Sequence, residues 1–276
     1  MSLRLRKRKE KIPLKLRMGE ATMSVFTSEI ERRNDITILR MARGAVNALD
    51  LDAVERLADT LARLAEDDTI GALVLTGAGP AFSAGLDLKA VPGYARPEQR
   101  ALVEGLNRLF GGLYQFPVPT VAAINGHAIA GGMVLALACD HRICTRGKAT
   151  LGLSEVKAGV PYPVAAIEVA RGELSPAAAR AMVLFGRLVG ADQALAWGVI
   201  DELAEPESLL DRAIAEAMSL AQLPRGTYGQ VKRQLRGPAL ARIKAAIETE
   251  EDPTLETWLT AETRQAAEGI LLRGSA

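Results

Sequence analysis

Short apolar runs alternate with amphipathic stretches along most of the chain from Ile36 onward. Between residues 50 and 66, apolar side chains recur at intervals of three and four, which places them on one face of a helix. They are Leu51, Val54, Leu57, Leu61 and Leu64. The pattern predicts further helices at 99–113 and from Ala130 onward, and strands at 36–41, 71–76, 118–124, 142–144 and 199–201. Strand, helix and strand in repeated order predict an α/β fold with a parallel sheet and right-handed crossovers.

The pattern changes after residue 205. Before that point, Ser175 and Pro176 have the residue types that begin a helix, as the N-cap and the first helical position. From Pro206 onward the sequence is almost entirely helical. We therefore expect an α/β core over residues 23–205 and a helical region over 206–276 that packs on the core or on a neighbouring subunit.

The first 22 residues differ from the rest in charge. They carry eight basic and two acidic residues, whereas the whole chain has a net charge of only +1. A basic arm of this kind can bind an anionic partner. It lacks the apolar centre of a signal peptide. We interpret residues 1–22 as a disordered or non-native leader, with Met18 or Met23 as the natural start.

Composition narrows the classes of function. With 4% aromatic residues the chain is poor in stacking surfaces for nucleic acid, and no apolar run is long enough for a membrane span. Cys139 and Cys144 have neither a zinc spacing nor a disulfide framework, which favours a reducing, cytoplasmic setting. Two histidines do not support a histidine-based metal site, so no metal is expected.

Two segments with small residues follow predicted strands. They read "AFSAGLDLK" at 81–89 and "INGHAIAGG" at 124–132. Each can present a backbone N–H group at the end of a parallel strand, and two such groups together form an oxyanion hole. Each segment taken alone is also explained by close helix–strand packing. The glycines of "GAGPAFSAG" match neither the dinucleotide-binding nor the phosphate-loop spacing.

These segments and four others resemble the crotonase, or enoyl-CoA hydratase/isomerase, superfamily in order and spacing. The other four are "GAVNALD", "ALACDHRI", "LGLSEVKAG" and "GADQALAWGVIDEL". The resemblance implies a core of repeated ββα units, a helical C-terminal region that forms trimers or dimers of trimers, and an acyl-CoA substrate. It implies no separate cofactor, since coenzyme A is part of the substrate. The family's two oxyanion donors fall on Leu86 and Gly131.

The resemblance also assigns substrate-binding positions. Ala45, Val46 and Ala84 match positions whose backbone lines the path of the coenzyme. For Lys89 two interpretations are open: its side chain reaches the coenzyme phosphates, or it is an ordinary lysine exposed to solvent. Tyr162 is expected to fill a wall near the acyl group. Trp258 either caps the acyl pocket or packs in the helical layer, and we favour packing.

Family hydratases use two glutamates, and this chain keeps one of them. Val134 stands at the first position and Glu155 at the second. One carboxylate in an apolar pocket, with Val134 contributing to that pocket, suffices to move a proton between two carbons. The sequence therefore favours a Δ3,Δ2-enoyl-CoA isomerase with Glu155 as its acid and base. The alternatives are a hydratase with a substituted acid, a thioester or C–C bond hydrolase, and an acyl-CoA-binding scaffold without turnover.

Overall fold

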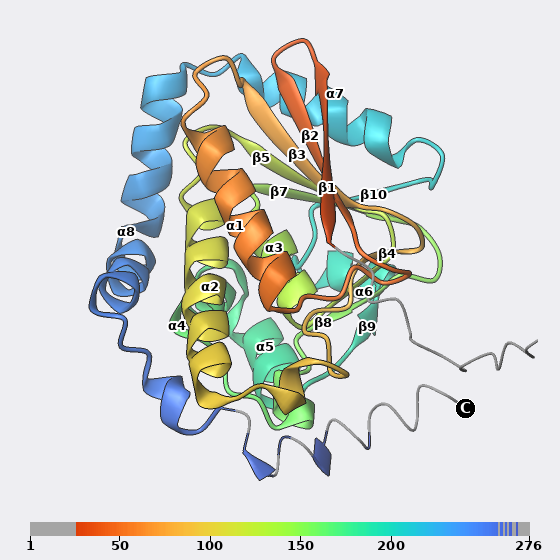
Figure 1. Ribbon diagram of the computed structural model, residues 1–276. Helices are drawn as coiled ribbons and strands as arrows, with labels where there is room; N and C mark the ends of the chain where they lie inside the picture. The colour runs from red at the N-terminus through yellow and green to blue at the C-terminus, as the bar shows by residue number, and fades with distance from the viewer. Residues whose placement is uncertain (1–25, 259, 262, 264, 267–268, 270–276) are drawn as a thin grey trace, which may run out of the picture.

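A six-stranded sheet forms the centre of the computed structural model, which describes residues 26–258, 260–261, 263, 265–266 and 269. Its strands lie in the order β1-β2-β3-β5-β7-β10 (Figure 1). They are β1 (Thr27–Arg33), β2 (Ile36–Ala42), β3 (Ala72–Gly77), β5 (Thr120–Ile124), β7 (His141–Thr145) and β10 (Glu202–Ala204). All neighbouring pairs are parallel except β1 and β2. The predicted parallel α/β core is confirmed.

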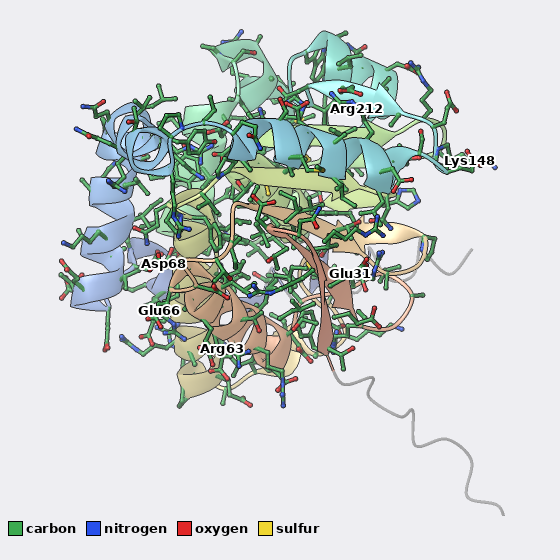
Figure 2. All side chains as sticks on the ribbon, turned by 90° about the horizontal axis from the view of Figure 1, so that it is seen from above. Glu31, Arg63, Glu66, Asp68, Lys148 and Arg212 are labelled. Carbon is green, nitrogen blue, oxygen red and sulfur yellow. The ribbon has the colours of Figure 1, made fainter. Side chains whose placement is uncertain are left out.

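Helices cover both faces of this sheet. They are α1 (Leu51–Ala65), α2 (Arg96–Tyr114), α3 (Gly131–Ala138), α4 (Val164–Glu173), α5 (Pro176–Ala179), α6 (Ala191–Ala196), α7 (Leu209–Ala221) and α8 (Arg225–Thr249). Alternate residues of the strands point to opposite faces, so Leu73 and Leu75 pack in the larger core with α1 to α4. Ala72 and Val74 pack in a smaller core with α7. The charged side chains of this outer layer, such as Arg212 on α7, lie at the periphery (Figure 2).

The predicted strand at 199–201 is wrong, because the strand begins at Glu202. Val199 and Ile200 are buried, but their backbone closes the end of α6, where Val199 N–H donates to the Ala194 carbonyl. Asp201 N–H then donates to the carbonyl of Arg142 at 2.9 Å. The apolar residues at 199 and 200 are therefore helix-end anchors, and burial alone misassigned them to a strand.

A second, smaller sheet lies below the first and was not predicted. It contains β4 (Ala81–Ser83), β6 (His127–Ile129), β8 (Thr150–Gly152) and β9 (Val189–Gly190), in the order β4-β6-β8-β9. The first three strands are parallel. Strands of three residues are too short to show a two-residue period in the sequence. Because the strands are parallel, their carboxyl ends meet at one edge.

A buried polar cluster holds the loop between β2 and α1 against the start of the second sheet. The Asn47 side chain is fully buried and donates to the carbonyls of Ala78, Ala81 and Phe82, at 2.9, 2.9 and 3.2 Å. Its carbonyl oxygen accepts from the backbone N–H of Arg43. One amide side chain thus replaces the backbone pairing that this loop cannot make.

Buried ion pairs attach α8 to the core. Lys232 and Arg236 of α8 contact the Asp140 carboxylate at 2.8 and 2.9 Å, and Arg236 also contacts Glu173 of α4 at 3.0 Å. Helix α8 packs against α2 and α4 of its own chain (Figure 1). The helical region was expected to pack either on the core or on a neighbouring subunit, and α8 packs on the core of its own chain. Across the residues that the structure describes, no helix is both long and apolar enough to cross a bilayer.

Replacing Asn47 with alanine should lower the free energy of unfolding by about 3 kcal/mol, because three buried carbonyls lose their donor. Asn47 also has a positive φ of 49°, which alanine adopts less readily. Urea denaturation of both proteins measures the change. Gln234→Ala, on the exposed face of α8, is the control and should change stability by less than about 0.5 kcal/mol. Equal stability of the two variants would contradict the role given to Asn47.

Candidate active site

The three residues that the sequence singles out for chemistry follow three neighbouring strands of the second sheet. Leu86 follows β4, Gly131 follows β6 and Glu155 follows β8. These strands are parallel, so their carboxyl ends and the residues after them meet at one edge. The second sheet therefore brings together residues that are up to 69 positions apart in the chain.

The turn after β4 packs directly against the start of α3. Gly85 has a φ of +77°, and a Cβ atom there would lie 2.8 Å from the carbonyl oxygen of Ile129 and 2.9 Å from the nitrogen of Gly131. A Cβ atom on Gly132 would lie 2.2 Å from the carbonyl oxygen of Ser83. Neither position can hold a side chain without displacing backbone. The glycines allow the close packing expected of them, and that packing places the two predicted oxyanion donors next to each other.

Both predicted donor groups are free. Within the described part of the chain, no hydrogen-bond acceptor is assigned to the backbone N–H of Leu86 or of Gly131. Leu86 forms a parallel bridge with Leu49. In this bridge the Leu49 N–H donates to the Gly85 carbonyl, and the Asp87 N–H donates to the Leu49 carbonyl. The N–H of Leu86 itself therefore points away from Leu49. Gly131 is the first residue of α3, where N–H groups have no partner inside the helix. Ala130 before it has an unusual φ of +52° and ψ of −126°, a strained conformation that sets the direction of this helix end.

Glu155 is the first residue of a short 3-10 helix, η2 (Glu155–Ala158), and is buried. Its Oε2 atom has no hydrogen-bond partner among the described residues. Burial raises the pKa of the carboxyl group to about 7, against smaller opposing effects of the Tyr162 hydroxyl and of the Ser154 and Glu155 backbone. At neutral pH this group exists in both protonation states, as an acid and base catalyst requires.

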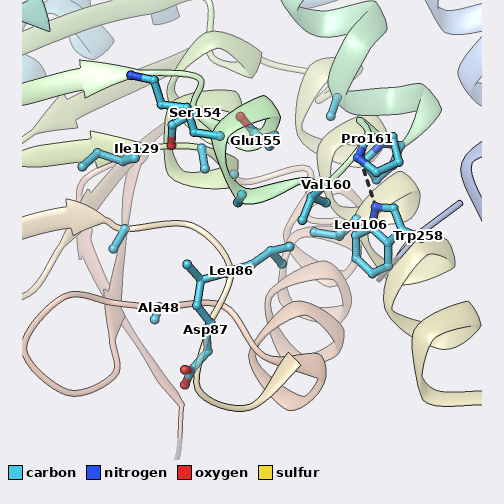
Figure 3. A pocket seen from close by; sticks show the side chains of 18 of the residues that line it. Ala48, Leu86, Asp87, Leu106, Ile129, Ser154, Glu155, Val160, Pro161 and Trp258 are labelled. Atoms are coloured by element: carbon cyan, nitrogen blue, oxygen red, sulfur yellow. Dashed lines mark hydrogen bonds between the residues drawn. The ribbon is translucent and has the colours of Figure 1, made fainter. Parts of the chain in front are cut away.

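These groups share one cavity of about 880 Å³. Leu86, Gly131 and Glu155 all line it, and apolar side chains of α2, α4, the segment between η2 and α4, and the C-terminal region form its wall. Those side chains include Leu106, Phe110, Val160, Pro161, Pro163, Ala166 and Trp258. Figure 3 shows Glu155 and Leu86 facing the same space, with Trp258 at one side. Size and lining suit a ligand that is largely apolar.

Asp87 is a second carboxylate at the cavity, but its oxygens are occupied. Oδ2 forms an ion pair with Arg43 at 2.9 Å, and Oδ1 accepts from the Lys89 backbone at 3.0 Å. Arg43 is itself buried and also contacts Asp50 at 2.6 Å. In Figure 3 the Asp87 carboxylate lies beyond Leu86 from Glu155. Glu155 is therefore the cavity-lining carboxylate that is not neutralised by a cation in the described structure.

Six of the nine predicted site residues line this cavity. They are Val46, Ala84, Leu86, Lys89, Gly131 and Glu155. The lining does not include Ala45, Val134 or Tyr162, and Val134 is fully buried inside α3. The Tyr162 side chain is directed toward Glu155, whose carboxyl group it affects. The roles of all nine residues in substrate binding stay predictions.

Sequence reasoning missed several lining residues. Lys157, two positions after Glu155, is a second cation at the cavity beside Lys89. Leu106 and Phe110 are four positions apart on α2, a spacing that indicated only a buried helix face. Trp258, predicted to pack in the helical layer, is buried and also lines the cavity. Its indole N–H donates to the Pro161 carbonyl at 2.9 Å (Figure 3).

Two free backbone amides beside one buried carboxyl group can stabilise charge on a carbonyl oxygen and move a proton. This combination of groups is suited to a reaction that passes through an enolate or a related anion. The described residues contain no group of three or more His, Cys, Asp or Glu side chains arranged to hold a metal ion.

Comparison with known proteins assigns the family. The profile of the enoyl-CoA hydratase/isomerase family matches residues 31–272. The chain therefore belongs to this family of acyl-CoA enzymes, as the sequence motifs predicted. It is 38% identical over 201 residues to a "Putative enoyl-CoA hydratase" of Thermus thermophilus, covering 72% of this chain and 74% of that protein.

Other relatives carry the names of different reactions. A 4-chlorobenzoyl coenzyme A dehalogenase of Arthrobacter is 30% identical over 226 residues, which cover 80% of this chain and 82% of the dehalogenase. One solved structure of a Mycobacterium tuberculosis protein is named an enoyl-CoA isomerase and matches with a TM-score of 0.71 and 32% identity, covering 81% of this chain and 96% of that one. Another solved structure of the same protein is named a "probable enoyl-CoA hydratase". Family membership thus fixes the fold and the substrate class, and leaves the reaction to the residues of the site.

The burial of Glu155 should make stability depend on pH. A carboxyl group whose pKa rises from 4.5 to about 7 on folding binds more protons in the folded state between these values, so stability falls as pH rises from 4.5 to 7. Above pH 7 the ionised group destabilises the fold by about 3 kcal/mol. We expect Glu155→Gln to match the wild type near pH 4.5 and to exceed its stability at pH 8.5. Urea denaturation across this range tests the difference, and a pH-independent difference would contradict the assignment.

Proposed function

We propose that the protein is an enoyl-CoA isomerase that moves a double bond from C3 to C2 of an acyl-CoA thioester. The observation that carries the proposal is the single free carboxyl group, Glu155, opposite the amides of Leu86 and Gly131 in one apolar cavity. The proposal agrees with one of the two names that the mycobacterial relative carries, the other being "probable enoyl-CoA hydratase". Other relatives are named for hydration and dehalogenation.

In the proposed reaction, the Glu155 carboxylate removes a proton from C2, which lies between the thioester carbonyl and the double bond. The electron pair of the C–H bond forms a double bond between C1 and C2, and the carbonyl electron pair moves to the thioester oxygen, while the C3=C4 bond stays in place. The N–H groups of Leu86 and Gly131 stabilise this dienolate. The Glu155 carboxylic acid then returns the same proton to C4, where the C3=C4 electron pair forms the new C–H bond. The C1=C2 pair becomes the C2=C3 bond, and the oxygen electron pair re-forms the thioester carbonyl. Because every proton and electron pair is conserved, the reaction needs no cofactor.

The cavity suits this transfer in two ways. Its apolar walls keep water from exchanging with the proton held on Glu155. A pKa of about 7 lets the same group take a proton and give it back without a large energetic step in either direction. The exposed Lys89 and Lys157 at the cavity are in our proposal the partners of the coenzyme's phosphates.

Hydration is the second candidate, favoured by the name of the Thermus relative. Adding water across a conjugated double bond is generally served by two carboxylates, one to deprotonate water and one to supply a proton. Here Asp87 would have to be the second. Its Oδ2 atom is held in an ion pair with Arg43 and its Oδ1 atom accepts from the Lys89 backbone, so both oxygens are already engaged. A non-catalytic scaffold is disfavoured because it gains nothing from burying a carboxyl group, which costs stability.

Isomerisation of a 3-enoyl-CoA should exceed hydration of the matching 2-enoyl-CoA, and Glu155→Gln should lower the kcat of isomerisation at least about 100-fold. Following conjugated enoyl thioester by its ultraviolet absorbance measures both reactions. The matched control is Glu104→Gln, the same change on α2 outside the cavity lining, which should retain activity. Isomerisation that survives Glu155→Gln would refute the mechanism. Dominant hydration that is lost in Asp87→Asn would favour the second candidate.

The pH dependence of isomerisation should follow the ionisation of Glu155. Since the free enzyme must hold the carboxylate to accept a proton, kcat/KM should rise with pH and level off above a midpoint near 7. A midpoint near 4.5, the ordinary value of a glutamate, would contradict a buried base. The profile is measured with a 3-enoyl thioester of pantetheine, because the phosphomonoester of coenzyme A itself titrates at about pH 6.

A further inference from the structure

Two buried oxygen atoms near the cavity have no hydrogen-bond partner in the described part of the chain. One is Oε2 of Glu155, and the other is the hydroxyl oxygen of Tyr162. Buried polar atoms are nearly always paired, so such atoms need an explanation. We propose that Tyr162 is a positioning residue whose hydroxyl group holds the Glu155 carboxylate in place during turnover. This inference rests on the proposed function, in which Glu155 is the base.

Tyr162 lies in the short segment that joins η2, which begins at Glu155, to α4. Its neighbours Pro161 and Pro163 both line the cavity, whereas Tyr162 does not. Burial raises the pKa of both groups; the Tyr162 hydroxyl group opposes part of this rise at Glu155, and the Glu155 carboxylate adds to the rise at Tyr162. No hydrogen bond of normal geometry joins them in this structure. Catalytic hydrogen bonds are often long or poorly aligned in unliganded enzymes and tighten when substrate binds.

The backbone on both sides of Tyr162 is held firmly by the C-terminal region. The carbonyl of Pro161 accepts from the Trp258 indole at 2.9 Å, and that of Gly159 accepts from the Thr263 hydroxyl at 2.7 Å. The Val164 N–H donates to Asp252 at 2.9 Å. The rings of Pro161 and Pro163 also fix φ at their own positions. A hydroxyl group on so restricted a segment is preorganised to orient a neighbouring side chain.

Few other charged groups face Glu155. The turn after β4 contributes Asp87 and Lys89 to the cavity, and η2 contributes Lys157. Asp87 is paired with Arg43, and both lysines are exposed. The helices α2 and α4 contribute only apolar side chains to this cavity. Among side chains, Tyr162 is the one that offsets the effect of burial on Glu155.

The hydroxyl group can serve both protonation states of Glu155. Toward the carboxylate it donates its O–H, and toward the carboxylic acid it can rotate and accept. Burial raises the pKa of Tyr162, so the phenol stays neutral and does not itself take part in the proton transfer. Its effect should therefore be on the orientation and acidity of Glu155, with little contribution to substrate binding.

Tyr162→Phe removes the hydroxyl group and keeps the ring. Loss of a donor to the carboxylate should move the midpoint of the kcat/KM profile upward by about one pH unit. At pH 7 the ionised fraction of Glu155 in this variant is then about a fifth of that in the wild type, so kcat/KM should fall about fivefold. KM should change less than kcat. The matched control is Tyr228→Phe, because Tyr228 also places a partly buried hydroxyl group beside a carboxylate, Asp140, away from the cavity lining.

The outcomes separate this inference from the proposed function. A Tyr162→Phe profile that coincides with those of the wild type and Tyr228→Phe, while Glu155→Gln is inactive, would overturn the role of Tyr162 alone. Activity that persists in Glu155→Gln would overturn the proposed function first. If Tyr162→Phe does not fold, 3-fluorotyrosine at position 162 keeps the shape and strengthens the donor. It should then move the midpoint to lower pH, and an unchanged midpoint would again overturn the inference.

Discussion

The packing of Gly85 against Ala130 and Gly131 is the contact on which the site depends. It brings the turn after β4 within van der Waals distance of the first turn of α3, which aligns two unpaired N–H groups along one cavity. Any side chain at position 85 would push these segments apart. The strained Ala130 is tolerated because the buried cores around it fix its position. The short strands of the second sheet serve chiefly to set this contact.

Glu155 has an energetic cost that the fold must offset. An ionised carboxyl group in an apolar cavity is unfavourable, and its raised pKa is the measure of that cost. The extended buried core stabilises the fold enough to offset the cost of burying Glu155. Proteins commonly give up stability at sites where reactivity is needed. In the proposed reaction, the same desolvation that destabilises the fold would keep the proton on Glu155 until it is returned to the substrate.

Local sequence motifs predicted the parallel α/β core and three residues that line one cavity, and they predicted tertiary contacts less well. The meeting of the Leu86 and Gly131 segments was inferred from parallel pairing, and Glu155 was added from the family resemblance, although the strands that these residues directly follow, β4, β6 and β8, were not predicted. The three-residue strands of the second sheet have no detectable period. The roles of Phe110 and Trp258 in the wall depend on how α2 and the C-terminal region pack, which no local pattern encodes. The direction of the Tyr162 side chain depends likewise on the anchoring of its neighbours.

The pairing of Asp87 with Arg43 bears on the reaction as much as the free state of Glu155. Two carboxyl groups line the cavity, and a count of acidic residues alone would allow two-carboxylate chemistry. Arg43 is buried between Asp50 and Asp87, so releasing Asp87 would leave part of a buried guanidinium charge unpaired. The ion pair that orders the loop before α1 thereby removes one carboxylate from proton transfer. A site with one mobile proton and a stabilised oxyanion is suited to shifting a double bond, because the atom removed in the first step is the atom returned in the second.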